Sequence, residues 1–266
     1  MRDRTFEGAL RVTKYVRAIY KGAPIWGRVK DDTVVLLRRA PWIDRSESGQ
    51  TVKFNRRDLL APAEPSKVIL VGLNYHEHIK ESQSATKAPD EPVIFIKPNT
   101  AVIGPNDEIP RYGFLERQDY EGELAAVLGR PIFHASEWEV RQAIFGYTCL
   151  NDVTARTLQK KDVQWTRAKG FDGFCPVGPW IVTDIDPTNL KIETRLNGEI
   201  RQSGNTADQI WNIFILTKFI SDVMTLLPGD IISTGTPQGV GNMAPGDIIS
   251  ISIEHIGTLE NRVKSA

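Results

Sequence analysis

Cysteine is scarce in this chain of 266 residues, and neither sign of charge is in excess. The only cysteines are Cys149 and Cys175, so a disulfide framework is not indicated and a reducing, cytoplasmic setting is expected. Lysine plus arginine balance aspartate plus glutamate at 33 each, without a clustered basic run. Nucleic acid and membrane surfaces are therefore not expected partners. A composition of 41% hydrophobic and 25% charged residues is that of an ordinary globular protein.

Long apolar runs are also missing. The longest apolar-rich stretch, residues 210–227, is interrupted by Asn212, Lys218 and Asp222. It predicts a helix of a soluble protein and not a membrane span. Residues 1–7 contain no apolar segment, so a secretory signal is not expected.

Short strand patterns dominate what is present. Apolar alternation at residues 17–20 and 23–29 flanks the turn Lys21-Gly22, and a third run follows at residues 33–37. A proline-bearing connector, residues 61–67, is the best domain boundary. We therefore expect a small N-terminal β domain over residues 1–61 and a larger domain over residues 67–266. The fold class is α+β, mainly β.

The larger part combines strands with two clear helices. Apolar strands are predicted at residues 68–72 and 92–98, and Asn197-Gly198 predicts a hairpin over residues 191–201. A capping box at Ser136 starts one helix, which runs to about residue 145. The other helix is predicted from Thr206 to about residue 223. Two Gly-Asp pairs open the last long strands, at residues 229–233 and 246–253.

Four acidic residues form the most informative pattern. Glu121 and Glu123 stand two residues apart at the start of a strand, so alternation places them on one face, with Asp119 flanking them. Asp152 follows about thirty residues later. Carboxylates on one face repel unless a cation or solvent separates them, and an all-oxygen set suits Mg²⁺ or Mn²⁺ better than zinc. The alternative is the solvated face of a half-exposed strand.

A histidine and a glutamate form a second candidate pair. Asn74 can cap a short helix on which His78 and Glu81 are i,i+3 neighbours. A carboxylate beside an imidazole fixes its tautomer and raises its basicity, as a general base for water requires. The segment that follows is polar, so residues 76–90 could form a mobile lid. The alternative is a polar surface helix with fortuitous pairs.

A lysine and a glycine-rich segment complete the candidates. Lys169 lies among glycines and aromatic residues and could neutralise a developing oxyanion or enolate. The alternative is an exposed loop lysine. Residues 233–241 follow a strand and could offer backbone N–H groups to an anion, or form a turn between strands. They contain no Gly-Lys-Ser/Thr, so they are not a phosphate-binding P-loop.

Together these pieces resemble the fumarylacetoacetate hydrolase superfamily over roughly residues 67–263. The motifs occur in the family's order: Val71-Gly72-Leu73-Asn74-Tyr75-x-x-His78, Phe95-Ile96-Lys97-Pro98, Asp119-Tyr120-Glu121-Gly122-Glu123-Leu124, Asp152-Val153-Thr154-Ala155-Arg156, Lys169-Gly170-Phe171-Asp172 and Thr234-Gly235-Thr236-Pro237-x-Gly239-Val240-Gly241. The resemblance implies strands rolled around a central cleft, usually in a homodimer.

The resemblance also implies roles for individual residues. Mg²⁺ or Mn²⁺ would be held by Glu121, Glu123 and Asp152. The lid dyad would be His78 and Glu81, and the active-site lysine Lys169. The residues that match cleft-lining positions of related acylpyruvases are Lys97, Gln159 and Thr236. Leu73 stands where close acylpyruvases have an arginine, so a carboxylate contact would be missing.

The expected activity is Mg²⁺-dependent hydrolysis of a C–C bond in a 2,4-dioxo acid of the acylpyruvate or fumarylpyruvate type, through a metal-stabilised enolate. The alternative is decarboxylation or isomerisation of a 2-oxo or 2-hydroxy-dienoic dicarboxylate, of the oxaloacetate or homoprotocatechuate-pathway type. A third hypothesis, from another class, is a non-catalytic binding domain stabilised by an enclosed cation. It predicts no adjacent cleft and no common focus for His78, Glu81 and Lys169.

Overall fold

The computed structural model describes residues 12–53, 55–82 and 87–266. An antiparallel meander opens the chain, with β1 (Thr13–Tyr20), β2 (Ala23–Lys30), β3 (Thr33–Leu37) and β4 (Glu47–Lys53). Lys21 and Gly22 have φ of 51° and 79°, as the tight hairpin between β1 and β2 requires. The short strands predicted for this region are confirmed. The prediction about a secretory signal concerns residues 1–7, which lie outside the described residues.

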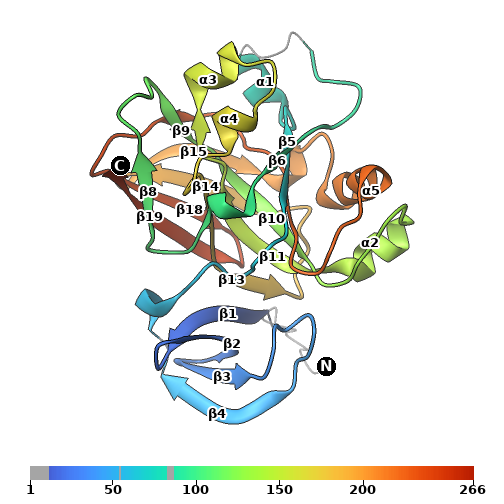
Figure 1. The fold of residues 1–266 in the computed structure, drawn as a ribbon. Helices are drawn as coiled ribbons and strands as arrows, with labels where there is room; N and C mark the ends of the chain where they lie inside the picture. Colours follow the sequence, from blue (N-terminus) through green and yellow to red (C-terminus); the bar gives the residue numbers. More distant parts are fainter. Residues whose placement is uncertain (1–11, 54, 83–86) are drawn as a thin grey trace, which may run out of the picture.

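The meander forms its own lobe in Figure 1, yet its first strand joins the main sheet. β1 pairs antiparallel with β13 (Cys175–Thr183), with Thr13 opposite Thr183 and Tyr15 opposite Ile181. From β13 the sheet continues through β11 (Ile144–Asn151), β10 (Gly122–Leu128), β16 (Ile231–Ser233), β5 (Val68–Gly72) and β6 (Val93–Lys97). The short β7 (Val102–Ile103) also pairs with β13, in parallel. The small unit and the large one therefore share one hydrogen-bonded sheet.

A second sheet packs against this one. Its order is β15 (Glu199–Asn205), β14 (Lys191–Leu196), β18 (Ile248–Ile253), β19 (Gly257–Ser265) and β8 (Glu108–Arg111). The predicted hairpin at Asn197-Gly198 joins β14 to β15. The main core cluster includes Leu124 and Val182 of the first sheet and Ile192, Ile251 and Leu259 of the second. The mainly-β fold class is confirmed.

A third, three-stranded sheet lies beside the candidate site. It contains β12 (Thr154–Ala155), β9 (Gln118–Tyr120) and β17 (Gly241–Asn242). The helices α1 (His76–Ser82), α3 (Arg156–Lys161) and α4 (Thr166–Lys169) gather at the same end of the molecule (Figure 1). Short 3₁₀ turns occur at Arg56–Asp58, Asn99–Ala101 and Thr206–Asp208.

The two longer predicted helices are found, one with a different start. α2 (Glu137–Ala143) begins at the predicted capping box, in which the backbone N–H of Glu139 donates to the Ser136 hydroxyl. α5 (Ile213–Val223) does not begin at Thr206, because Asn212 is its N-cap and accepts from the backbone N–H groups of Phe214 and Ile215. Within the described residues, no helix is long and apolar enough to cross a membrane.

Candidate active site

Sheet register brings three carboxylates together. Glu121 lies at the break between β9 and β10, and Glu123 is one alternation further on. β11 pairs with β10 so that Asn151 faces Gly122, and the backbone N–H of Asp152 donates to the carbonyl of Glu121 at 2.8 Å. Oxygens of Glu121, Glu123 and Asp152 therefore lie within 4.8 Å of one another, and all three side chains are buried.

The pKa values of the two glutamates are shifted in opposite directions in this cluster. Burial raises the pKa of Glu123 well above its usual value, and the nearby charges of Asp152 and Glu121 raise it further. The Ser233 hydroxyl and the Gly235 backbone N–H donate to one Glu123 oxygen, at 2.5 and 3.0 Å. Burial alone would also raise the pKa of Glu121, but Lys169 and Arg156 hold it well below its usual range. Positive charge therefore decides how many of these carboxylates are ionised.

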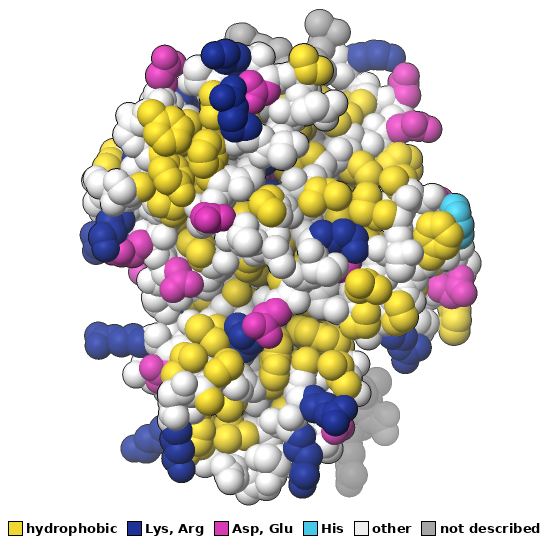
Figure 2. Space-filling view, in the orientation of Figure 1, with side chains coloured by type: hydrophobic (Ala, Val, Ile, Leu, Met, Phe, Trp, Pro, Cys, Tyr) yellow, Lys and Arg dark blue, Asp and Glu magenta, His cyan; other side chains and the backbone are white. Residues whose placement is uncertain are grey.

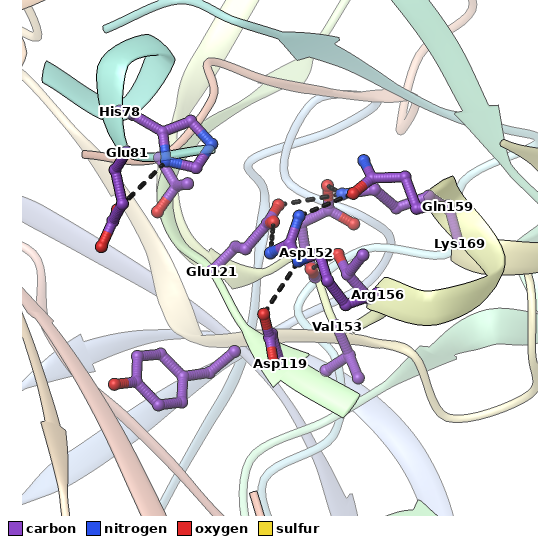
Figure 3. A network of polar contacts seen from close by, with 12 residues as sticks. His78, Glu81, Asp119, Glu121, Asp152, Val153, Arg156, Gln159 and Lys169 are labelled. Carbon is purple, nitrogen blue, oxygen red and sulfur yellow. Dashed lines mark hydrogen bonds and ion pairs between the residues drawn. The ribbon is translucent and has the colours of Figure 1, made fainter. Parts of the chain in front are cut away.

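Lys169 contacts two members of the cluster. Its Nζ lies 2.9 Å from Glu121 Oε2 and 2.5 Å from Asp152 Oδ2 (Figure 3). Burial by itself would lower the pKa of Lys169, but Asp152 and Glu121 outweigh burial and raise it. Lys169 is therefore a buried ammonium at neutral pH and not an exposed loop lysine.

Arg156 joins the cluster to a fourth carboxylate. Its Nε donates to Asp119 Oδ2 at 2.8 Å, its Nη2 contacts Glu121 Oε1, and its Nη1 donates to Gln159 Oε1 at 2.7 Å (Figure 3). The arginine stands four residues after Asp152, on the first turn of α3. No role was predicted for Arg156 from the sequence, and Asp119 was expected only as a flanking group. The sequence Thr154-Ala155-Arg156, which follows Asp152 after one residue, was the available signal.

His78 and Glu81 meet on α1, as their spacing suggested. His78 Nδ1 is 3.7 Å from Glu81 Oε2, and the same Glu81 oxygen accepts the backbone N–H of Gly239 at 2.9 Å. The contact with His78 lowers the pKa of Glu81; burial opposes this, and the Gly239 amide adds to the lowering. Part of the predicted lid, residues 83–86, lies outside the described residues.

Asn74 does not cap α1, so that prediction is wrong. Its side-chain amide donates to the carbonyls of Trp211 and Thr234, and its oxygen accepts the backbone N–H of Trp211. Asn74 therefore connects the start of the lid segment to the loop before α5. Its buried amide group finds both donor and acceptor partners in this position, which a helix N-cap would not provide.

A narrow cavity lies over the carboxylates. Its polar lining comprises Glu121, Glu123, Asp152, His78, Arg156, Gln159, Lys169 and Thr236, and its apolar lining comprises Val71, Gly72, Leu73, Phe95 and Trp165. Gln159 uses its oxygen on Arg156, so its amide hydrogens remain for a ligand. The Thr236 hydroxyl is already engaged, accepting from Gln202 and donating to the carbonyl of Gly122.

Lys97 does not line this cavity, contrary to expectation. Its side chain is completely buried. Its Nζ donates to the backbone carbonyls of Val153, Lys169 and Phe174 at 2.9, 2.6 and 2.8 Å. An ammonium has three hydrogens to donate, so none remains for a substrate. The prediction of a substrate contact is corrected on that ground.

The donor set fits a divalent cation. Three buried carboxylates within reach of one point are the hard oxygen ligands that Mg²⁺ and Mn²⁺ bind, and no histidine or cysteine belongs to the cluster. Burial raises the pKa of Glu123, and repulsion from the charges of Asp152 and Glu121 raises it further. A cation there would relieve that repulsion.

Comparison with known proteins agrees with this geometry. Residues 67–264 match the family model described as fumarylacetoacetate (FAA) hydrolase, C-terminal, which is most of the chain. The chain belongs to the fumarylacetoacetate hydrolase family. Residues 13–62 match a second model, Rv2993c-like, N-terminal.

Relatives within the fumarylacetoacetate hydrolase family carry several activities in their names. The crystal structure of a 2-hydroxyhepta-2,4-diene-1,7-dioate isomerase from Mycobacterium marinum is 42% identical, with a TM-score of 0.87 over 95% of this chain and 98% of that one. Oxaloacetate tautomerase YisK of Bacillus subtilis (strain 168) is 43% identical over 75% of this chain and 70% of its own. A 2,4-didehydro-3-deoxy-L-rhamnonate hydrolase of Sphingomonas sp. (strain SKA58) is 39% identical over 74% and 73%.

Proposed function

We propose that this family member catalyses keto–enol proton transfer on a 2-oxo acid, as a metal-dependent tautomerase or isomerase. One observation carries the proposal: an imidazole, 3.7 Å from a carboxylate, and a buried ammonium line the same narrow cavity above a carboxylate cluster. His78, Lys169 and the cluster come from separate chain segments, yet they share one focus. A non-catalytic domain with an enclosed cation would show no such cavity.

Each side chain has a task in this chemistry. A divalent cation held by Glu121, Glu123 and Asp152 supplies Lewis acidity toward the oxygens of the substrate when it is bound. Lys169 offsets the negative charge that develops on the keto oxygen as the enolate forms. His78 takes a proton from the carbon next to the keto group and returns it in the reverse direction. Its Nδ1 faces Glu81, which leaves Nε2 for the transfer.

The names of the relatives support placing tautomerase or isomerase activity before hydrolysis. The Mycobacterium marinum protein is named an isomerase and the Bacillus subtilis protein a tautomerase, and neither name involves added water. Decarboxylation of a 2-oxo dicarboxylate passes through the same kind of enolate and needs no other group. Fold alone does not decide among these reactions.

Hydrolysis of a C–C bond in a 2,4-dioxo acid, the activity expected from the sequence, is the second candidate. The His78–Glu81 pair favours it, because an imidazole beside a carboxylate can activate water as readily as it moves a proton at carbon. The Sphingomonas relative is named a hydrolase.

The test compares both substrate classes on one enzyme preparation with Mg²⁺. Ketonisation of freshly dissolved oxaloacetate enol is followed by ultraviolet absorbance, and hydrolysis of acylpyruvates by release of pyruvate. We expect ketonisation to be accelerated, and Glu123→Ala and excess chelator to abolish the acceleration. Hydrolysis without ketonisation would favour the second candidate. Activity toward neither class, or full activity in chelator, would end the metal-enolate proposal.

We also propose a homodimer. Tyr112, Phe114 and Phe171 form an aromatic cluster in which Phe114 is 72% exposed. Figure 2 shows hydrophobic side chains gathered on the surface beside β8. An exposed phenylalanine on top of half-buried aromatic residues gives an apolar surface of the kind that marks association sites. A monomeric mass in solution would contradict the proposal.

A further inference from the structure

Lys97 is a completely buried charged side chain beside the site, and its partners lie in three separate stretches of the chain. It ends β6, directly before Pro98, and none of its surface reaches solvent. Besides its three carbonyl partners, its Nζ lies 2.9 Å from Asp152 Oδ1. That carboxylate oxygen has no hydrogen-bond donor among the described residues. The Lys97 ammonium is thus the positive charge that lies beside Asp152 Oδ1.

The three carbonyls bound by Lys97 belong to the backbone that carries the site. Val153 follows Asp152, and the second carbonyl is that of Lys169 itself. The third, Phe174, precedes β13. Between Asp152 and Lys169 the chain runs through β12, two short helices and a connecting loop. The Lys97 ammonium binds the backbone at both ends of this stretch and so links them directly.

The contacts of Lys97 and Lys169 are complementary. Lys169 Nζ approaches Asp152 Oδ2, while Lys97 lies against Asp152 Oδ1. The Asp152 carboxylate is thus held from two sides, by one ammonium that lines the cavity and one that does not. Groups that orient ligating carboxylates in this way tune metal affinity without contacting the substrate.

We propose that Lys97 is a positioning residue of the enolate-forming site. Its ammonium fixes the Asp152 carboxylate and the backbone of Lys169 relative to each other, and so sets the geometry of the cation site and of the lysine that faces the substrate. Only the predicted effect on turnover rests on the proposed function. The effect on the cation site can be tested without any substrate.

The experiment compares Lys97→Met with Lys67→Met. Lys67 is a matched control, since it forms another lysine–aspartate pair, 2.7 Å from the buried Asp230, outside the cavity lining. Mn²⁺ alone is titrated into each metal-free protein, and the bound ion is counted by electron paramagnetic resonance. We expect Lys97→Met to bind Mn²⁺ about 10- to 100-fold more weakly, and Lys67→Met to bind it as wild type does.

The kinetic part follows turnover at saturating metal. We expect kcat of Lys97→Met to fall by about 10- to 100-fold with KM nearly unchanged, because the side chain does not reach the cavity. Two results would overturn the proposal: wild-type Mn²⁺ affinity in Lys97→Met, or a raised KM with kcat retained, which would make Lys97 a substrate contact. If no substrate is turned over, the proposed function fails while the Mn²⁺ titration still decides the role of Lys97.

Lys97→Arg covers the case in which Lys97→Met does not fold. It keeps the charge, but a planar guanidinium cannot direct one nitrogen at three converging carbonyls. We expect a folded protein with Mn²⁺ affinity between those of wild type and Lys97→Met, a reduced kcat and a constant KM. Wild-type affinity and kcat in this variant would also overturn the proposal.

Discussion

The buried Arg156 should contribute far more to stability than its exposed neighbour on the same carboxylate. Arg156→Met removes the partner of Asp119 and Glu121 that lies inside the protein. Breaking a buried ion pair typically costs about 3–5 kcal/mol, because a charge is left behind without compensation. Here Asp119 keeps Arg117, and Glu121 keeps Lys169. We therefore expect the lower end, about 3 kcal/mol.

The matched control is Arg117→Met. The Arg117 side chain also binds Asp119, at 2.8 Å, but it is 48% exposed. Solvent screens such pairs, so a loss of about 0–1 kcal/mol is expected. A loss of about 3 kcal/mol corresponds to roughly 6–12 °C in Tm for a chain of this size.

Urea and thermal unfolding at one fixed protein concentration measure both variants. Equal losses for Arg156→Met and Arg117→Met would show that burial of the pair does not matter. A loss below about 1 kcal/mol for Arg156→Met would refute the reasoning directly.

Four further outcomes are expected. His78→Ala should lower the proton-transfer rate by roughly two to four powers of ten while Mn²⁺ affinity barely changes, since the imidazole is not a ligand; an equal loss in the surface variant Glu77→Ala would contradict this. Glu123→Ala should stay folded by circular dichroism and lose Mn²⁺ binding in a titration. The pKa of Glu81 in the folded protein is below its ordinary value of 4.5. Wild type should therefore be more stable than Glu81→Gln by a constant amount above pH 4.5, and this advantage should shrink as the pH falls through the folded-state pKa. Urea unfolding measures it, and an advantage that grows in acid would contradict the prediction. Phe114→Asp should convert the proposed dimer to monomer in sedimentation analysis.

The carboxylate cluster could be predicted from the sequence because its geometry follows from local rules. Strand alternation places Glu121 and Glu123 together, and the family motifs supplied Asp152. The antiparallel register then explains why Asp152 arrives beside Glu121. The hairpin at Asn197-Gly198 and the capping box at Ser136 were predictable for the same reason, since each is decided by neighbouring residues.

The errors concern side chains whose partners are distant in sequence. Asn74 looked like a helix cap, but Trp211 and Thr234 claim its amide. Lys97 looked like a cleft residue, but three carbonyls from 56 to 77 residues away enclose it. The start of α5 was misplaced because threonine and asparagine both favour N-cap positions. In the structure Thr206 opens a separate 3₁₀ turn capped by Asn205, and Asn212 caps α5.

The pairing of β1 with β13 has a consequence for anyone who shortens this protein. The family match beginning at residue 67 invites removal of the N-terminal unit as though it were an independent module. Its departure would uncover the backbone N–H and C=O groups of Ile181, Val182 and Thr183, which β1 now occupies. An uncovered edge next to buried apolar strands is a template for pairing between molecules. We therefore expect a protein shortened to residue 67 to self-associate through this edge.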